Sequence, residues 1–252
     1  MKKLYRVSDD EVIAEFLKNE YFYPEYHSDR EKYESIVMNP DLSNSAESAM
    51  RRQLLYRRRA HNWRELPLDT QWWVVELESM DLRKLRITPR GHWGKMTDHN
   101  FPSLEDIVDS IRQKRFPRSV DFDVSIIQSL CYRLRCESGV SSVLLIGLDE
   151  DHDLTILEGN HRLSAGLLAD QGLIKSRFRV YAGLSMRMRE YWLYESNVRN
   201  FGRHMLNRVR GMFGRDADLT FEPPVRAFPA CMDGKAPDQA PITRTGTLPE
   251  NG

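Results

Sequence analysis

The chain has 252 residues, 40% of them hydrophobic, and its 37 basic and 37 acidic residues give a formal net charge of zero. This length and composition suffice for a substantial core and exclude a chain too polar to fold. No run approaches the roughly 18 consecutive apolar residues of a membrane helix, and the N-terminus turns acidic before any signal-like stretch develops. We therefore expect a cytoplasmic protein with no membrane partner.

Three cysteines are present, an odd number without metal-ligand spacing: Cys131, Cys136 and Cys231. Neither a disulfide framework nor a zinc site is expected from them. We interpret them as buried thiols.

Residues 1–70 are predicted to form a helical N-terminal extension. Ser8 and Glu11 fit a capping box, and apolar residues at helical spacing predict a helix over 9–20. A second helix is predicted over 44–60, where Arg51 and Arg58, like Arg52 and Arg59, are seven residues apart and so share a face. This basic face is either a solvated surface or a patch that contacts phosphate.

Residues 71–185 carry both strand and helix patterns, and we expect an α+β fold. A strand is predicted over 72–78, followed by the short segment "LRKLRI", a long mixed loop, and helices over 104–114 and 121–136. Two apolar strands within "SSVLLIGLDEDHDLTILEG" are joined by a polar turn. A helix that ends at Gly172 and a last strand in "SRFRVYAGL" follow.

The C-terminal part begins with a basic helical segment, 186–215. Six of the twelve prolines lie between 223 and 249, so residues 216–252 are expected to be a disordered tail. Arginines are concentrated in 51–64, which holds six arginines and no acid, and in 177–215, which holds nine. Nucleic acid is therefore a possible partner through these two segments.

The stretch "ILEGNHRLSAGLLA" places several versatile polar side chains in one turn, Glu158 to Arg162. A strand that ends in a glycine turn and opens a helix presents unpaired backbone N–H groups and the positive end of the helix dipole, which suits a phosphate. Gly159 lets the backbone approach the ligand, Arg162 can donate a bidentate pair, and His161 can donate a hydrogen bond or move a proton. Glu158 can act as a base or bind magnesium. The alternative is a simple Glu158–Arg162 ion pair at a helix start, with His161 exposed.

The hairpin, turn, helix and strand of "VLLIGLDEDHDLTILEGNHRLSAGLLADQGLIKSRFRVYAG" resemble the core of the ParB/sulfiredoxin superfamily, with its D-G-x-H-R-like turn. The similarity covers about 72–184 and implies a small mixed sheet with helices, flanked by the helical extensions at both ends. It also implies nucleotide phosphates at the turn. By motif position Glu158 takes the family aspartate's place, Gly159 the glycine's, Asn160 the variable third place, and His161 and Arg162 the phosphate-contacting pair.

The branch with His and Arg in these places includes sulfiredoxins and ParB-like amino-acid kinases, which use a nucleotide and magnesium. Sulfiredoxins carry a reactive cysteine just before the His-Arg pair, where this chain has Asn160, so that chemistry is not expected. The kinases carry aspartate where Glu158 stands, and a catalytic glutamate in the loop before the first core helix. The only acid in that loop here is Asp98, which is either the base that accepts a hydroxyl proton or a solvated acid, with Lys95 or Arg90 on a phosphate.

Three functions remain open from the sequence. The first is a phosphotransferase that moves phosphate from ATP, with Mg²⁺, to a small-molecule acceptor. The second is a ParB-like DNA-binding protein or nuclease whose binding is controlled by a nucleotide. The third is a nucleotide-binding module without turnover. Residues 1–70 are expected to help form a specificity pocket or to mediate the formation of a homodimer.

Overall fold

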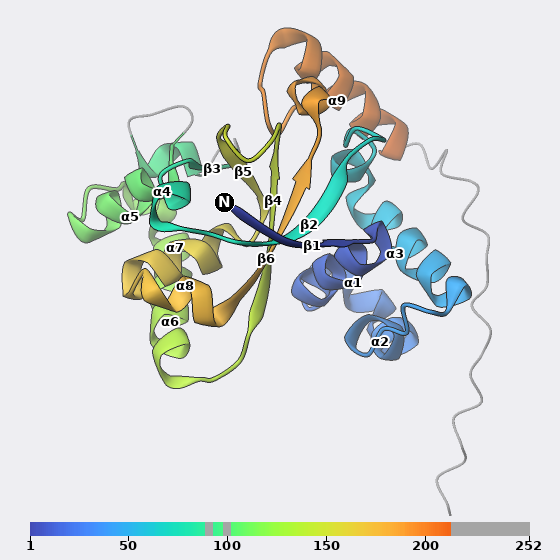
Figure 1. The fold of residues 1–252 in the computed structure, drawn as a ribbon, viewed down its shortest axis with the longest axis horizontal. Helices are drawn as coiled ribbons and strands as arrows, with labels where there is room; N and C mark the ends of the chain where they lie inside the picture. Colours follow the sequence, from blue (N-terminus) through green and yellow to red (C-terminus); the bar gives the residue numbers. More distant parts are fainter. Residues whose placement is uncertain (89–92, 98–101, 213–252) are drawn as a thin grey trace, which may run out of the picture. The chain divides into compact units, whose positions relative to one another are not determined.

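The computed structural model describes residues 1–88, 93–97 and 102–212. Its centre is a six-stranded mixed sheet of order β1-β2-β6-β4-β5-β3 (Figure 1). The strands are β1 (Lys2–Val7), β2 (Gln71–Glu76), β3 (Leu85–Ile87), β4 (Ser141–Gly147), β5 (Leu154–Glu158) and β6 (Phe178–Leu184). β6 pairs in parallel with β4, and β3 with β5, whereas the other neighbours are antiparallel. The expected α+β class is confirmed.

Helices cover both faces of the sheet. One face carries α1 (Asp9–Glu20), α2 (Arg30–Met38) and α3 (Ser45–Trp63), and the other carries α5 (Leu104–Arg112), α6 (Asp121–Cys136), α7 (Asn160–Ala169) and α8 (Gly172–Arg177). α4 (Ser79–Leu82) precedes β3, and α9 (Val198–Met212) packs on α3. Short 3-10 turns complete the described part: η1 (Pro24–Asp29), η2 (Trp93–Met96), η3 (Arg118–Val120) and η4 (Met186–Glu190).

β4 runs through the middle of the sheet and is buried on both sides. Val143 and Leu145 belong to the core under α5–α8, while Leu144 and Ile146 belong to the core under α1–α3. Successive side chains of a strand point to opposite faces. A continuous apolar run is therefore what a strand between two helical layers requires.

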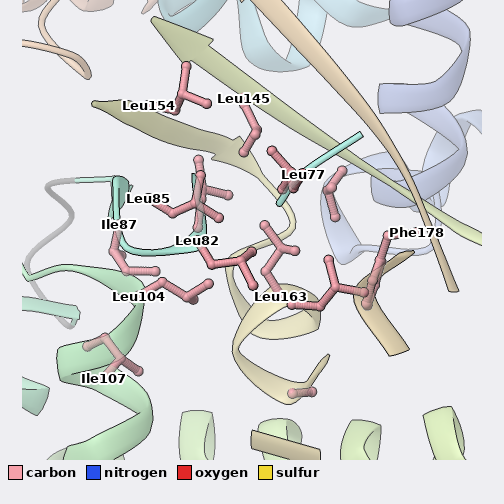
Figure 2. Close-up of a cluster of buried hydrophobic side chains, with 14 of the residues drawn as sticks. Leu77, Leu82, Leu85, Ile87, Leu104, Ile107, Leu145, Leu154, Leu163 and Phe178 are labelled. Carbon is pink, nitrogen blue, oxygen red and sulfur yellow. The ribbon is translucent and has the colours of Figure 1, made fainter. Parts of the chain in front are cut away.

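The start of α7 is anchored by the core under α5–α8. Leu163, with no exposed surface, points into the cluster of leucines shown in Figure 2, together with Leu145 of β4 and Leu154 of β5. Burial of a leucine side chain contributes about 2 kcal/mol. The turn that precedes Leu163 is thereby fixed against the sheet.

The N-terminal region is not a helical extension, because it contributes a strand and one complete helical layer. β1 pairs with β2, and the described residues all belong to one compact unit. The helix predicted over 9–20 is confirmed as α1, whose first turn is capped by Ser8 Oγ accepting from the backbone N–H of Glu11 at 3.2 Å. α2 and β1 were not predicted.

Two other boundaries differ from the prediction. α7 ends at Ala169, and Gly172 begins α8 instead of ending the preceding helix, because Asp170 Oδ1 accepts from the backbone N–H of Gly172 at 2.9 Å. The basic segment 186–215 is not one helix, since η4 and α9 are separated by a non-helical stretch. The predicted tail, 216–252, lies outside the described residues.

Of the cysteines, Cys131 is buried and Cys136 is exposed, so the prediction of buried thiols is wrong for Cys136. Cys231 lies outside the described residues. Among the helices that the structure describes, none has the length and apolar content to cross a membrane.

Candidate functional site

Gly159 forms the turn between β5 and α7. Its φ of 103° lies in the left-handed region, and a Cβ at this position would come within 2.6 Å of Val143 Cγ1. Only glycine adopts this backbone without strain, and a side chain at this position would collide with Val143 of β4. The glycine predicted to admit a ligand is therefore required first by the close approach of the turn to β4.

The first turn of α7 carries no side-chain cap. Asn160, at 9% exposure, has an Oδ1 atom without a hydrogen-bond partner, and the Oγ atom of the fully buried Ser164 also lacks one. Buried polar atoms without partners are rare in folded proteins. The helix start thus offers backbone N–H groups to an anion. The Asn160 and Ser164 oxygens can in addition accept a hydrogen bond from a donor.

Glu158 and Arg162 form the ion pair that the sequence left open as the alternative. Arg162 Nη2 donates to Glu158 Oε2, and Arg162 Nη1 donates to Asn19 Oδ1 at 2.7 Å and to Ser141 Oγ. Asn19 Nδ2 donates in turn to Glu158 Oε2 at 2.9 Å and to the carbonyl oxygen of Ser142. The end of α1, the start of β4 and the start of α7 are joined by this network.

Burial raises the pKa of Glu158, and Glu20 raises it further, while the Arg162 guanidinium opposes them. Glu20 itself is ion-paired with Arg59, which stands at a kink in α3 with φ −131° and ψ 19°. Burial likewise raises the pKa of Tyr23, with Glu158 and Glu20 adding to the effect. Two carboxylates and two guanidinium groups therefore gather beside the turn.

His161 is directed to a different partner. Its Nε2 lies 2.9 Å from Asp123 Oδ1 of α6, and its ring lies 4.8 Å from the ring of Trp93. The side chain is 24% exposed, so the imidazole is neither free in solvent nor paired with Arg162. A carboxylate at this distance fixes the orientation of the ring.

The expectation that a phosphate sits between His161 and Arg162 needs correction. Glu158 stands four residues before Arg162 and draws the guanidinium toward α1 and β4, whereas Asp123 draws the imidazole toward α6. Arg162 lines a cavity of about 270 Å³ with residues of α6 and β6. The imidazole and the guanidinium do not form a joint clamp in this structure.

The loop residues of the predicted site are only partly described. Asp98 and Arg90 lie outside the described residues. Lys95 lies on η2 and lines a separate cavity of about 420 Å³ with Asp106, Asp109 and Arg115, apart from the cavity that Arg162 lines.

Glu158 does not fit a magnesium ligand as placed, because the guanidinium of Arg162 already lies against its carboxylate. A second cation there would be opposed by the charge of the first. Across 1–88, 93–97 and 102–212, no group of three His, Cys, Asp or Glu side chains is placed to hold a metal ion.

The basic face predicted for α3 is also corrected. Arg51 is fully buried, with Nη2 donating to Ser48 Oγ at 2.9 Å and Nη1 3.5 Å from Glu47, and Arg59 is paired with Glu20. Arg52 remains on the surface, paired with Asp10, and the side chain of Arg58 is outside the described part.

Several residues of the site carry no signal in the sequence. Asn19 reaches Arg162 across 143 positions, and Asp123 reaches His161 across 38. Trp93 belongs to a segment predicted only as loop.

Comparison of the chain with protein-family models, with curated proteins and with solved structures finds no match. The resemblance to the ParB/sulfiredoxin superfamily therefore stays a prediction.

Proposed function

We propose that the chain is a nucleotide-binding phosphotransferase of ParB-like fold, which transfers phosphate from ATP to a small-molecule acceptor. One observation carries the proposal: α7 opens at a left-handed glycine, and no side chain caps the backbone N–H groups of its first turn. Uncapped backbone N–H groups and the helix dipole favour an anion at this place.

The surrounding side chains divide the work. The α7 backbone would hold the phosphate, and the imidazole of His161, oriented by Asp123, would donate to it or move the acceptor's proton at a ring nitrogen. Glu158 and Arg162 act as a structural pair that holds the turn between β5 and α7 against α1 and β4. Phosphoryl transfer depends chiefly on positioning and electrostatics. The α7 backbone and His161 would therefore supply what the protein itself has to contribute. Magnesium as a cofactor stays a prediction.

Nucleic-acid binding is less well supported by the geometry. Its support in the sequence is the arginines of 51–64 and of 177–215. In the first segment, Arg51, Arg52 and Arg59 are each engaged by an acid within the chain. Phosphate contacts dominate nonspecific affinity for nucleic acid and require available cations. The paired arginines of 51–64 therefore favour internal structure, whereas Arg199 and Arg208 of the second segment are exposed.

The test is binding of ATP followed by acceptor screening. ATP with magnesium at a hundred times its Kd should stabilise the chain by about 2.7 kcal/mol, a rise in Tm of roughly 5–10 °C. Release of ADP is then measured with amino acids, sugars and nucleic acid as acceptors. The proposal would be refuted if ATP with magnesium caused no shift in Tm and no acceptor led to release of ADP.

Asn160→Asp localises the site without changing side-chain size. A carboxylate there should repel the phosphate and weaken ATP binding at least about tenfold, while remaining compatible with a helix start. Asn197→Asp is the matched control, because Asn197 Oδ1 accepts from the backbone N–H of Asn200 at 2.9 Å at the start of α9. Equal ATP affinity in both variants would remove the site from α7.

A further inference from the structure

The outward face of α9 is apolar. Five large side chains on this helix are between 40% and 89% exposed: Val198, Phe201, Met205, Leu206 and Val209. Spacings of three and four residues place most of them on one side of a helix. We call these five residues the α9 stripe. Among the described residues, Trp192 packs on one end of the stripe, with its ring 5.2 Å from that of Phe201, yet all five side chains keep at least 40% of their surface exposed. A row of exposed apolar side chains on one helix marks a candidate interaction surface.

The inward face of α9 is polar instead. His204 Nδ1 lies 2.9 Å from Glu65 Oε1, Asn200 Nδ2 donates to the carbonyl oxygen of Arg189 at 2.8 Å, and Arg203 is paired with Glu190. Asn200 is 3% exposed and His204 is 9% exposed. The helix is therefore anchored by specific polar contacts that orient the apolar stripe away from the body. Figure 1 shows α9 (orange) beyond the end of the sheet at which β2 begins.

The charge of α9 selects among possible occupants. Its sequence, "VRNFGRHMLNRVRGM", contains four arginines and no acid. Arg199 and Arg208 are exposed and flank the stripe on either side. When the stripe is buried against a partner, such long side chains can extend past its edge and keep their charged ends in a polar environment. A second copy docked by a twofold axis would bring two such helices together without an acid to offset their charge.

We propose that α9 docks on an anionic lipid surface, with the α9 stripe in the headgroup region and the flanking arginines on lipid phosphates. A basic helix with a strongly apolar face lies in the plane of the membrane interface in this way. Docking of this kind is independent of the proposed phosphotransfer. It revises the expectation that no membrane takes part.

Two further exposed apolar residues lie on the segments that anchor α9. Leu68 follows Glu65 by three residues and is fully exposed, and Met186, at 68% exposure, begins η4, the turn that contains Glu190. Ser185 Oγ donates to Asp69 Oδ1 at 2.9 Å, which joins these two segments.

The experiment is flotation of the full chain with vesicles of phosphatidylcholine alone or mixed with an equal part of phosphatidylglycerol. Binding is expected only to the mixed vesicles and should weaken with added salt. Phe201→Gln with Leu206→Gln should reduce partitioning about a hundredfold, since each side chain contributes about a factor of ten when buried. Arg199→Gln with Arg208→Gln should cost about fivefold for each arginine.

The control is Phe122→Gln with Tyr132→Gln, which removes two exposed aromatic side chains from α6 and should leave partitioning unchanged. Vesicle binding that the stripe variant retains, or no binding to any vesicle, would overturn the proposal. Sedimentation of the full chain as a dimer that the stripe variant abolishes, without vesicle binding, would assign the stripe to a second copy. Capture of a synthetic amphipathic helix of Glu and Leu, again without vesicle binding, would assign it to an acidic protein partner.

Discussion

Replacement of Gly159 by alanine should destabilise the chain strongly, because the added methyl group brings both backbone strain and a steric clash. A non-glycine residue in the left-handed region costs about 1–2 kcal/mol. The new Cβ would also lie 2.6 Å from Val143 Cγ1 and 3.5 Å from the Val143 backbone, and forcing a methyl group into packed surroundings costs about 1–3 kcal/mol. The sum is about 2–5 kcal/mol, a large part of the roughly 5–15 kcal/mol by which domains are stable.

Urea unfolding followed by tryptophan fluorescence measures this loss as a lower midpoint at unchanged slope. Gly202→Ala is the matched control, because nothing lies within 4 Å of its added Cβ and the residue is within α9. That change should stabilise by about 0.5–1 kcal/mol. Adding Val143→Ala to Gly159→Ala should recover the steric part but not the backbone part, and the double-mutant cycle separates the two. A Gly159→Ala midpoint equal to the wild type would show that the turn before α7 is built differently.

Three further predictions concern burial and charge. Arg51→Ala should cost about 3–5 kcal/mol, because it leaves Glu47 buried without its cation, whereas the exposed neighbour Arg52→Ala should cost under about 1 kcal/mol; urea unfolding of the pair compares them, and equal losses would contradict the burial of Arg51. Burial raises the pKa of Glu158 above its ordinary 4.5, so ionisation penalises the folded state, and the free energy of unfolding of the wild type relative to Glu158→Gln should fall as pH rises through and above that value. If the difference in free energy of unfolding between the wild type and Glu158→Gln did not change with pH, the raised pKa of Glu158 would be contradicted. Gly183→Ala should cost about 1–3 kcal/mol, since its Cβ would lie 2.8 Å from an indole ring; unchanged thermal unfolding would contradict that contact.

Elements with strong local signals were predictable from the sequence. The helices α1 and α6 match their predicted ranges, 9–20 and 121–136, because a cap or a periodic apolar face marks each of them. β1 was missed because "KKLYRV" is an edge strand whose side chains are mostly exposed, so no apolar alternation marks it. Its pairing with β2 depends on contacts far away in the chain, which a local pattern does not contain.

The candidate site divides in the same way. The glycine turn and the start of α7 follow from the local pattern, and the left-handed φ of Gly159 agrees with it. The direction of each side chain does not follow, because Arg162 is positioned by Asn19 and His161 by Asp123, and both partners come from other elements.

The separation of His161 and Arg162 changes which groups contribute to the affinity for a bound phosphate. A guanidinium with three of its N–H groups occupied by Glu158, Asn19 and Ser141 has only two of five left for a phosphate. Removing Arg162 from its partners would leave a buried carboxylate without its cation, which costs several kcal/mol. Any polyanion at α7 therefore gains more from the backbone N–H groups and His161 than from Arg162. Mutation of Arg162 should consequently affect the stability of the chain before it affects the affinity for a nucleotide.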